Sequence, residues 1–333
     1  MSNIRNNGAA NNNAGNEGGR IMMANGTIRT MEAFAGTVKS AMEAVYGSGY
    51  SISIQVVTKN NGTHLTGLTI REEGADIAPT IYLESLFEGY QGGLTMETVC
   101  REVMRIYGQN KAVQGFDSSM VTDFSQAKDR ICFKLVNAEK NRGLLADTPY
   151  IPYHDLAIVF YVLVSKGEDG INIVLVRDSL MDVWGADVQT LYPIAMENTQ
   201  RIFRGSVRSM WSMMAELVEN MQDTGEFYDM PAITEDAFPF PMYIATNYDK
   251  LNGASVLLYP NLLRDFAERF DCDFYILPSS IHELIFLPDM LGMDIGDMKT
   301  MVRDINGSEV AEDEILSDSV YFYSRAYDRV EMM

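Results

Sequence analysis

The stretch CDFYILPSSIHELIFLPD, residues 272–289, holds two short apolar runs, FYIL and ELIFL, on either side of PSSIH. Each run is rich in strand-forming residues, and each is followed by a proline, Pro278 or Pro288. Proline followed by two serines is typical of a turn, because proline fixes φ and serine hydroxyls bond to nearby backbone. Strands joined by so short a connection pair antiparallel. The sequence therefore predicts a β-hairpin with strands at 274–277 and 284–287.

The same stretch contains the first candidate catalytic residues, Ser280 and His282. They lie two positions apart, so within a strand their side chains would face the same side. The sequence identifies neither an oxyanion hole nor a carboxylate that would orient the histidine. We therefore interpret PSSIH as a structural connection whose serines bond local backbone. A hydrolase or transferase that uses Ser280, His282, His154 and Asp155 is the alternative.

His154 and Asp155 stand at the mouth of DLAIVFYVLV, residues 155–164, the most apolar run in the chain. A histidine in this place is typically capped and hydrogen-bonded, and the alternative is a pocket residue. The run itself predicts a central strand, because strands buried on both faces are almost wholly apolar.

The strongest hairpin signal lies near the N-terminus. SISIQVV, residues 51–57, alternates apolar and polar positions, and THLTGLTI, residues 63–70, follows after KNNG. Asn-Gly accepts the positive φ that tight hairpins require, which predicts Asn61 and Gly62 at the turn. An amphipathic helix from about residue 31 to 45 is predicted before it, and PTIYL, residues 79–83, could add a third strand.

The remaining segments mix hairpins and helices without a regular βαβ alternation. This pattern predicts an α+β fold with mixed, largely antiparallel sheets and packed helices. Strands are expected at DRICFKLVN, INIVLV, MYIAT, GASVLLY and SVYFY, and helices at residues 84–90, 96–107, 260–270 and 294–305 and across much of 179–221.

Three regions are expected along the chain. Residues 1–24, rich in Asn and Gly, predict a disordered tail, because they hold almost no apolar residue to offset the entropy of ordering. Residues 25–120 form an N-terminal α+β region with the first hairpin, and residues 121–333 form the main α+β region. The stretch 108–120 is the expected seam, and both regions are expected to pack as one unit.

The charge balance limits the partners of the chain. With 46 acidic and 26 basic residues, the net charge is −20. Phosphate backbones repel such a chain, so direct nucleic-acid binding is disfavoured. Solubility is the simplest interpretation of the charge. Two functional alternatives are binding of a basic protein partner and inhibition of a nucleic-acid enzyme by an acidic surface.

Several kinds of site lack their sequence motifs. The chain contains no G-x-x-x-x-G-K-[ST], no G-x-S-x-G and no H-E-x-x-H. Three histidines and three widely spaced cysteines offer few zinc ligands, so we expect no metal, no cofactor and no disulfide. No apolar run reaches the length of about 18 residues that a membrane helix requires, and no signal core is visible. We therefore expect a cytoplasmic protein without membrane contact.

Several segments are distinctive as strings, among them DRICFKLVNAEKNRGLL, HDLAIVFYVLV, NGASVLLYP and DFYILPSSIHELIFLPD. Together they resemble a family of uncharacterised cytoplasmic proteins of clostridial gut bacteria, classified as a domain of unknown function, over residues 31–323. The last two thirds also resemble, more faintly, a second uncharacterised Firmicutes family. The resemblance implies one integrated unit in a bacterial cytoplasm and brings no catalytic residues. Our first hypothesis is a non-enzymatic protein that binds or regulates another protein.

Overall fold

The structure is a computed structural model that describes residues 28–75, 78–110, 117–167, 170–223, 241–278, 280–290, 292 and 294–333. The predicted tail, residues 1–24, lies outside this part of the chain. Helices and three antiparallel sheets make up the described residues, so the predicted α+β class is confirmed. The chain divides into two compact units.

The first unit contains the described residues up to Val56 and from Thr66 to Asn110. Its sheet has the strand order β1-β2-β3. Its elements are α1 (Met31–Tyr46), the 3-10 turn η1 (Gly47–Gly49), β1 (Tyr50–Thr58), β2 (His64–Glu72), β3 (Thr80–Tyr82), α2 (Glu84–Gln91) and α3 (Met96–Asn110), with the ends of β1 and β2 next to their turn belonging to the second unit.

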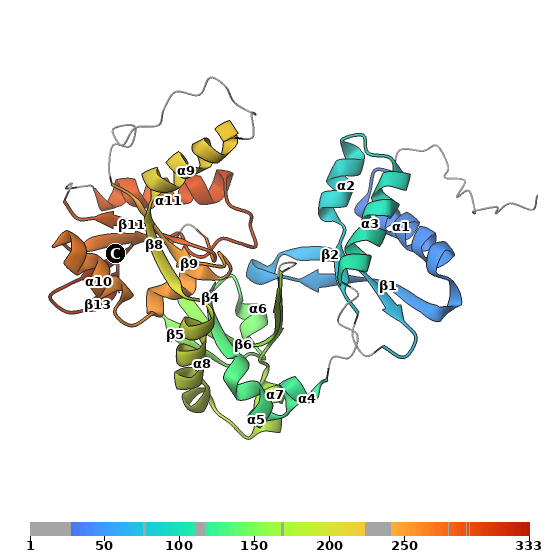
Figure 1. Ribbon diagram of the computed structural model, residues 1–333, viewed down its shortest axis with the longest axis horizontal. Coiled ribbons are helices and arrows are strands. Elements are labelled where there is room, and N and C mark those ends of the chain that lie inside the picture. The colour runs from blue at the N-terminus through green and yellow to red at the C-terminus, as the bar shows by residue number, and fades with distance from the viewer. Residues whose placement is uncertain are drawn as a thin grey trace, which may run out of the picture. The chain divides into compact units, whose positions relative to one another are not determined.

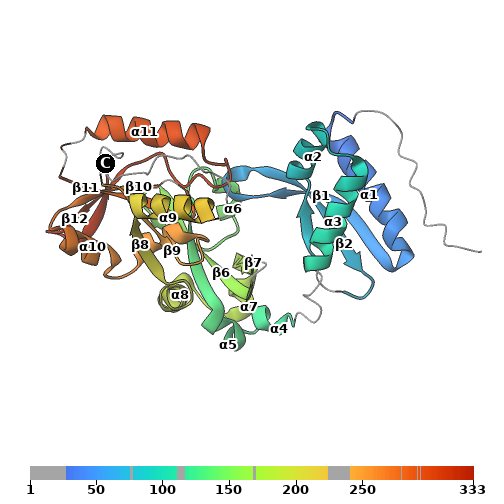
Figure 2. The ribbon, with the colours of Figure 1, turned by 45° about the horizontal axis from the view of Figure 1, so that its top comes forward.

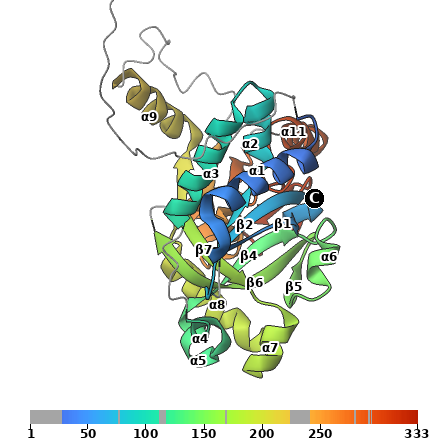
Figure 3. The same cartoon turned by 90° about the vertical axis from the view of Figure 1, so that its right-hand side faces the viewer.

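The helices of the first unit gather on one face of its sheet (Figure 3). α1 begins at Thr30, whose Oγ1 accepts a hydrogen bond from the Ala33 N–H at 3.3 Å, as an N-cap residue does. The middle of the predicted apolar stripe of α1 is buried and shares its core with β2 and α3, whereas Val45 at its end is 47% exposed. Buried members of this core include Phe34, Val38, Met42, Leu68, Ile70, Val99 and Val103.

The predicted turn between β1 and β2 is confirmed. Asn61 and Gly62 have φ values of 58° and 73°, in the left-handed region that this pair accepts. The Lys59 N–H donates to the Thr63 carbonyl at 2.7 Å and closes the turn. By its contacts, the segment Val57–Leu65, with the 3-10 turn η2 (Asn60–Gly62), belongs to the second unit.

The second unit contains this hairpin end and the described residues from 117 to 333 (Figure 1). Two antiparallel sheets form its framework. Its strands are β4 (Ile131–Asn137), β5 (Tyr150–Tyr153), β6 (Leu156–Gly167), β7 (Gly170–Leu175), β8 (Gly205–Ser209), β9 (Tyr243–Asn247), β10 (Phe274–Leu277), β11 (Leu284–Pro288), β12 (Tyr321–Ser324) and β13 (Arg329–Met332). Its helices are α4 (Ser119–Thr122), α5 (Phe124–Ala127), α6 (Arg142–Leu145), α7 (Asp178–Trp184), α8 (Val188–Ile202), α9 (Met210–Asp223), α10 (Leu262–Phe270) and α11 (Ile295–Ser308), with 3-10 segments η3 (Lys128–Arg130) and η5 (Gly253–Leu258).

The most apolar run is the central strand, as predicted. β6 pairs with β4 along one side and with β5 and then β7 along the other. Its residues from Leu156 to Leu163 are all buried. β5 carries Pro152, which fits a strand whose described pairing is with β6 alone.

The predicted hairpin at 272–289 is confirmed in the second sheet, whose order is β13-β12-β10-β11-β9-β8. β10 and β11 pair antiparallel with Ile276 opposite Phe286. Alternate residues bury on opposite faces. Phe274 and Ile276 pack in the cluster that includes α10, whereas Leu277 packs in the cluster that includes α11. α11 lies along one side of this sheet in Figure 2.

One predicted strand is wrong. GASVLLY forms the 3-10 segment η5, in which Gly253 to Leu257 are buried. A Cβ at Gly253 would lie 2.1 Å from Thr246 Oγ1 and 2.2 Å from the His282 carbonyl oxygen, so this position requires glycine. An apolar run buried on all sides has no period that separates a strand from a helical turn, which explains the error. Strands β5, β8 and β13 were not predicted.

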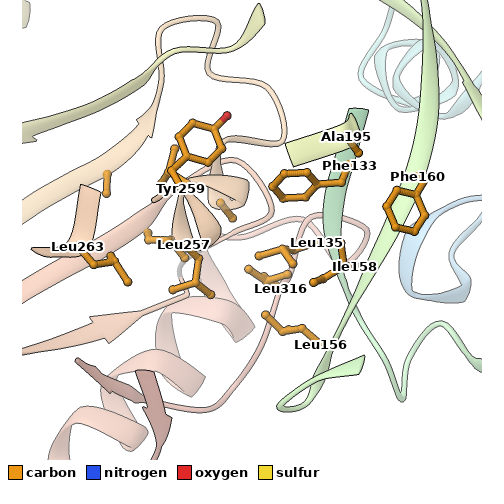
Figure 4. Packing of buried hydrophobic residues seen from close by; sticks show 14 of the residues in the cluster. Phe133, Leu135, Leu156, Ile158, Phe160, Ala195, Leu257, Tyr259, Leu263 and Leu316 are labelled. Atoms are coloured by element: carbon orange, nitrogen blue, oxygen red, sulfur yellow. The ribbon is translucent and has the colours of Figure 1, made fainter. Parts of the chain in front are cut away.

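The largest core joins the two sheets of the second unit. Side chains of β4 and β6 pack with those of α8, η5, α10 and the segment before β12 (Figure 4). Labelled members of this core are Phe133, Leu135, Leu156, Ile158, Phe160, Ala195, Leu257, Tyr259, Leu263 and Leu316.

Candidate functional site

Two of the four predicted site residues, Asp155 and His282, contact one segment of the second unit, residues 309–320, which links α11 to β12. This segment contains the acidic run EVAEDE and has little regular structure. The Ile281 N–H donates to the Glu314 carbonyl at 2.8 Å, and Asp155 accepts hydrogen bonds from serines of the segment. The contacts that hold this segment therefore make up the candidate site.

Ser280 and His282 do not form a nucleophile–base pair. Ser280 Oγ accepts a hydrogen bond from the backbone N–H of His282 at 3.0 Å, the local backbone bond predicted for a turn serine. His282 Nδ1 accepts from the Asn252 N–H at 3.2 Å, which places the imidazole proton on Nε2. Nε2 lies 3.5 Å from Glu314 Oε1. Both ring nitrogens thus face partners other than Ser280. Ser279 lies outside the described residues.

Asp155 is the acceptor of a cluster of hydroxyl groups. Its Oδ2 accepts hydrogen bonds from Ser317 Oγ at 2.5 Å and Ser319 Oγ at 3.1 Å, and its Oδ1 accepts from the Tyr321 hydroxyl. Ser317 and Tyr321 are fully buried. Burial, together with the charge of Asp155, raises the pKa of Tyr321 above its ordinary value. The phenol therefore stays protonated and donates to the carboxylate.

His154 occupies the turn between β5 and β6 with a φ of 54°. Its side chain is exposed, and its ring lies 4.6 Å from the ring of Tyr153 and 5.7 Å from that of Tyr321, centroid to centroid. The contacts found for this ring are with aromatic rings. In the described residues, no hydrogen bond joins His154 to Ser280 or His282.

Asparagines form the anchors that sequence reasoning missed. Each donates its side-chain amide to a main-chain carbonyl of residues 309–320, at distances of 2.7–3.0 Å. The bonds are Asn60 to Asp313, Asn61 to Glu312 and Ile315, Asn137 to Leu316, and Asn306 to Ser317. Asn-Gly was recognised only as a turn signal, and no local pattern distinguishes Asn137 or Asn306 from a surface asparagine.

The arrangement holds a segment in place and does not assemble a reaction centre from the predicted residues. The carboxylate of Asp155 is occupied by three hydroxyls, and the imidazole of His282 by a backbone amide and Glu314. Within the described residues, no group of three or more His, Cys, Asp or Glu side chains could hold a metal ion. None of the described helices is long and apolar enough to cross a membrane.

One comparison with known proteins finds a match, and it covers most of the chain. A search of the curated proteins and a search of the solved structures both find no match. A family model, described as a family of unknown function (DUF5688), matches residues 31–325, which includes both units and every residue of the site above. The chain therefore belongs to the DUF5688 family of unknown function.

Proposed function

We propose that this chain is a protein-binding protein that takes up an extended segment of its partner along the outer edge of β1. The supporting observation is the sequence of β1, YSISIQVVT, which contains no charged residue and no proline over nine residues. β1 is an edge strand of its sheet, with β2 as its neighbour in the described part of the chain.

Edge strands of this length are normally protected against pairing with other chains. The usual devices are a lysine or a proline on the edge, a bulge, or a very short strand. β1 contains neither lysine nor proline, and it is nine residues long. Its side chains add an apolar stripe. Ile52 is buried beneath the helices, whereas Ile54 and Val56 on the same face are 36% and 70% exposed. Main-chain pairing with contacts to alternate side chains is how β-augmentation recognises a peptide.

The charge of the chain indicates that the segment pairing with β1 comes from a different protein and not from a second copy of this chain. Pairing of β1 with β1 would bring together two chains that each carry a net charge of −20. A partner segment with basic residues on either side of an apolar strand would be attracted by the same charge. We place this interaction in the bacterial cytoplasm, as the sequence resemblance implies.

The proposal is tested with a synthetic peptide of alternating valine and threonine that carries two lysines at each end. We expect it to bind the full chain in fluorescence anisotropy and to slow amide exchange in β1. A peptide of equal charge with prolines in its centre should not bind, because proline cannot donate to the ladder.

Variants of the chain separate strand pairing from general electrostatic attraction. The double change Ile54→Lys and Val56→Lys should weaken peptide binding by about tenfold or more, because it places on β1 the lysines that usually protect an edge strand from pairing. Val45→Lys with Leu94→Lys is the control, because these side chains are 47% and 46% exposed in the same unit and the pair makes the same change of charge. Equal binding by the double variant and the parent, or protection outside β1, would refute the proposal.

A further inference from the structure

A pocket of about 440 Å³ opens on the second unit between the start of β8 and α10. This volume lies within the range of about 300–1,000 Å³ that is usual for small-molecule sites. Its apolar floor includes Tyr259, Leu262 and Phe266. The floor is fixed, because the Tyr259 hydroxyl donates to the Phe203 carbonyl at 2.7 Å.

Gly205 brings β8 directly against this floor. A Cβ at this position would lie 2.7 Å from Leu262 Cδ1 and 3.2 Å from Tyr259 Cδ2. The absence of a side chain therefore lets the strand and the aromatic ring meet closely. The result is a firm apolar surface at the base of an open pocket.

Two arginines on different elements line the same pocket, Arg204 before β8 and Arg269 in α10. Both are exposed, and neither forms an ion pair with a described carboxylate. Arg269 lies over the ring of its neighbour Phe270, with 5.3 Å between its Cζ and the ring centroid. That contact leaves the guanidinium donors available.

The neighbouring arginines behave differently. Arg208 of β8 pairs with Glu216, and Arg264 of α10 pairs with Asp328. Arg204 and Arg269 thus bring two guanidinium groups without a carboxylate partner among the described residues to one pocket. Asp265 also lines the pocket, and its carboxylate opposes a bound anion, but the two arginines leave the charged lining residues with a net charge of +1.

We propose that this pocket binds a small organic oxyanion, in which a carboxylate or phosphate is carried by an apolar body. The guanidinium groups match both oxyanions through paired N–H donors. The apolar body would lie on Tyr259, Leu262 and Phe266, which separates such ligands from inorganic ions. This site is on the second unit and is independent of the edge of β1.

Phenylacetate and phenyl phosphate are the probes, and ligand-observed NMR titration of the full chain at low ionic strength is the measurement. At least one of them should bind, and the stronger of the two identifies the oxyanion. Acetate and inorganic phosphate lack the apolar ring, and 2-phenylethanol lacks the oxyanion. Each of these compounds should therefore bind at least about tenfold more weakly than the probe.

Arg204→Gln and Arg269→Gln should each lower the affinity for the probe by about tenfold, because each substitution removes charged donors to the oxyanion. Arg303→Gln makes the same charge change on α11, outside the pocket, and should leave the affinity unchanged. Circular dichroism of each variant checks that the fold is retained. Absence of binding by both probes, or binding that neither pocket substitution weakens, would overturn the proposal.

Discussion

Asn61 and Asn141, 80 positions apart, exchange two hydrogen bonds of 2.9 Å. The backbone N–H of Asn61 donates to Asn141 Oδ1, and Asn141 Nδ2 donates to Asn61 Oδ1. Asn141 Nδ2 also donates to the Asn137 carbonyl. Through this exchange the hairpin end joins the same set of asparagines that holds residues 309–320.

Asn141→Ala should therefore destabilise the second unit by roughly 2 kcal/mol or more. Asn141 is 2% exposed, and a buried group left without its partner costs about 1–3 kcal/mol. Both tryptophans, Trp184 and Trp211, lie in the second unit, so tryptophan fluorescence during urea unfolding reports on it.

Asn172→Ala is the matched control. Its amide donates to Ser165 Oγ on the surface, so the same substitution should change the free energy of unfolding by less than about 0.5 kcal/mol. Asn61→Gly is the intermediate case. Glycine keeps the positive φ and the backbone bond to Asn141 Oδ1, but it loses the side-chain bonds to residues 141, 312 and 315. The loss in its free energy of unfolding should lie between the losses of Asn172→Ala and Asn141→Ala.

In the hairpin of β10 and β11, Ile276→Ala should cost more stability than Ser280→Ala. Ile276 is fully buried between β11 and β12, so its truncation leaves a cavity and costs about 2–5 kcal/mol. Ser280→Ala loses one bond to a nearby backbone amide, worth about 0.5–1.5 kcal/mol. Urea unfolding measures both variants. A larger loss for Ser280→Ala would contradict a purely local role for the serine.

Stability should fall as the pH rises above 9. Burial raises the pKa of the Cys132 thiol from 9.0 to about 11, against smaller lowering effects of Thr199, Tyr161 and Arg201. Between these values the unfolded chain loses the thiol proton and the folded chain keeps it, so each unit of pH removes up to about 1.4 kcal/mol. Burial also raises the pKa of Tyr153 to about 12, which extends the fall above pH 10.

Cys132→Ala tests this assignment, because alanine keeps a small apolar side chain and removes the thiol. The variant should lose stability less steeply than the parent between pH 9 and 10, as measured by urea unfolding at each pH. Some slope should remain, since burial also raises the pKa of Cys272. Lys134 acts in the opposite direction, because burial, with the charge of Lys59, lowers its pKa. Identical slopes for parent and variant would exclude Cys132 as a source.

Both hairpins were predictable because their turns carry their own conformational preferences. Asn61 and Gly62 accept positive φ, and proline with serine closes the turn after β10, whatever the rest of the chain does. Residues 309–320 are different. Their conformation depends on Asn60, Asn137 and Asp155, which lie more than 150 positions away, and a single sequence gives no sign of such partners.

The local backbone bond of Ser280 could be predicted from the sequence, but the partners of Asp155 and His282 could not. Histidine and aspartate at strand ends are compatible with catalysis and with structural anchoring, and only the partners separate the two. His282 faces a backbone amide and Asp155 faces three hydroxyls, which the spacing of residues along the chain could not indicate.

Asp155 and Tyr321 should be energetically coupled to each other through their hydrogen bond. Tyr321 is fully buried and donates to a carboxylate, and hydrogen bonds to charged groups are worth about 1.5–3 kcal/mol. A double-mutant cycle with Asp155→Asn and Tyr321→Phe should therefore give a coupling of about 1 kcal/mol or more in the free energy of unfolding. Asp155→Asn with Tyr323→Phe is the control cycle, because the Tyr323 hydroxyl donates to Asp328 instead. That pair should be additive within about 0.5 kcal/mol. Additivity in the Asp155–Tyr321 cycle as well would show that this buried bond adds nothing to the free energy of unfolding.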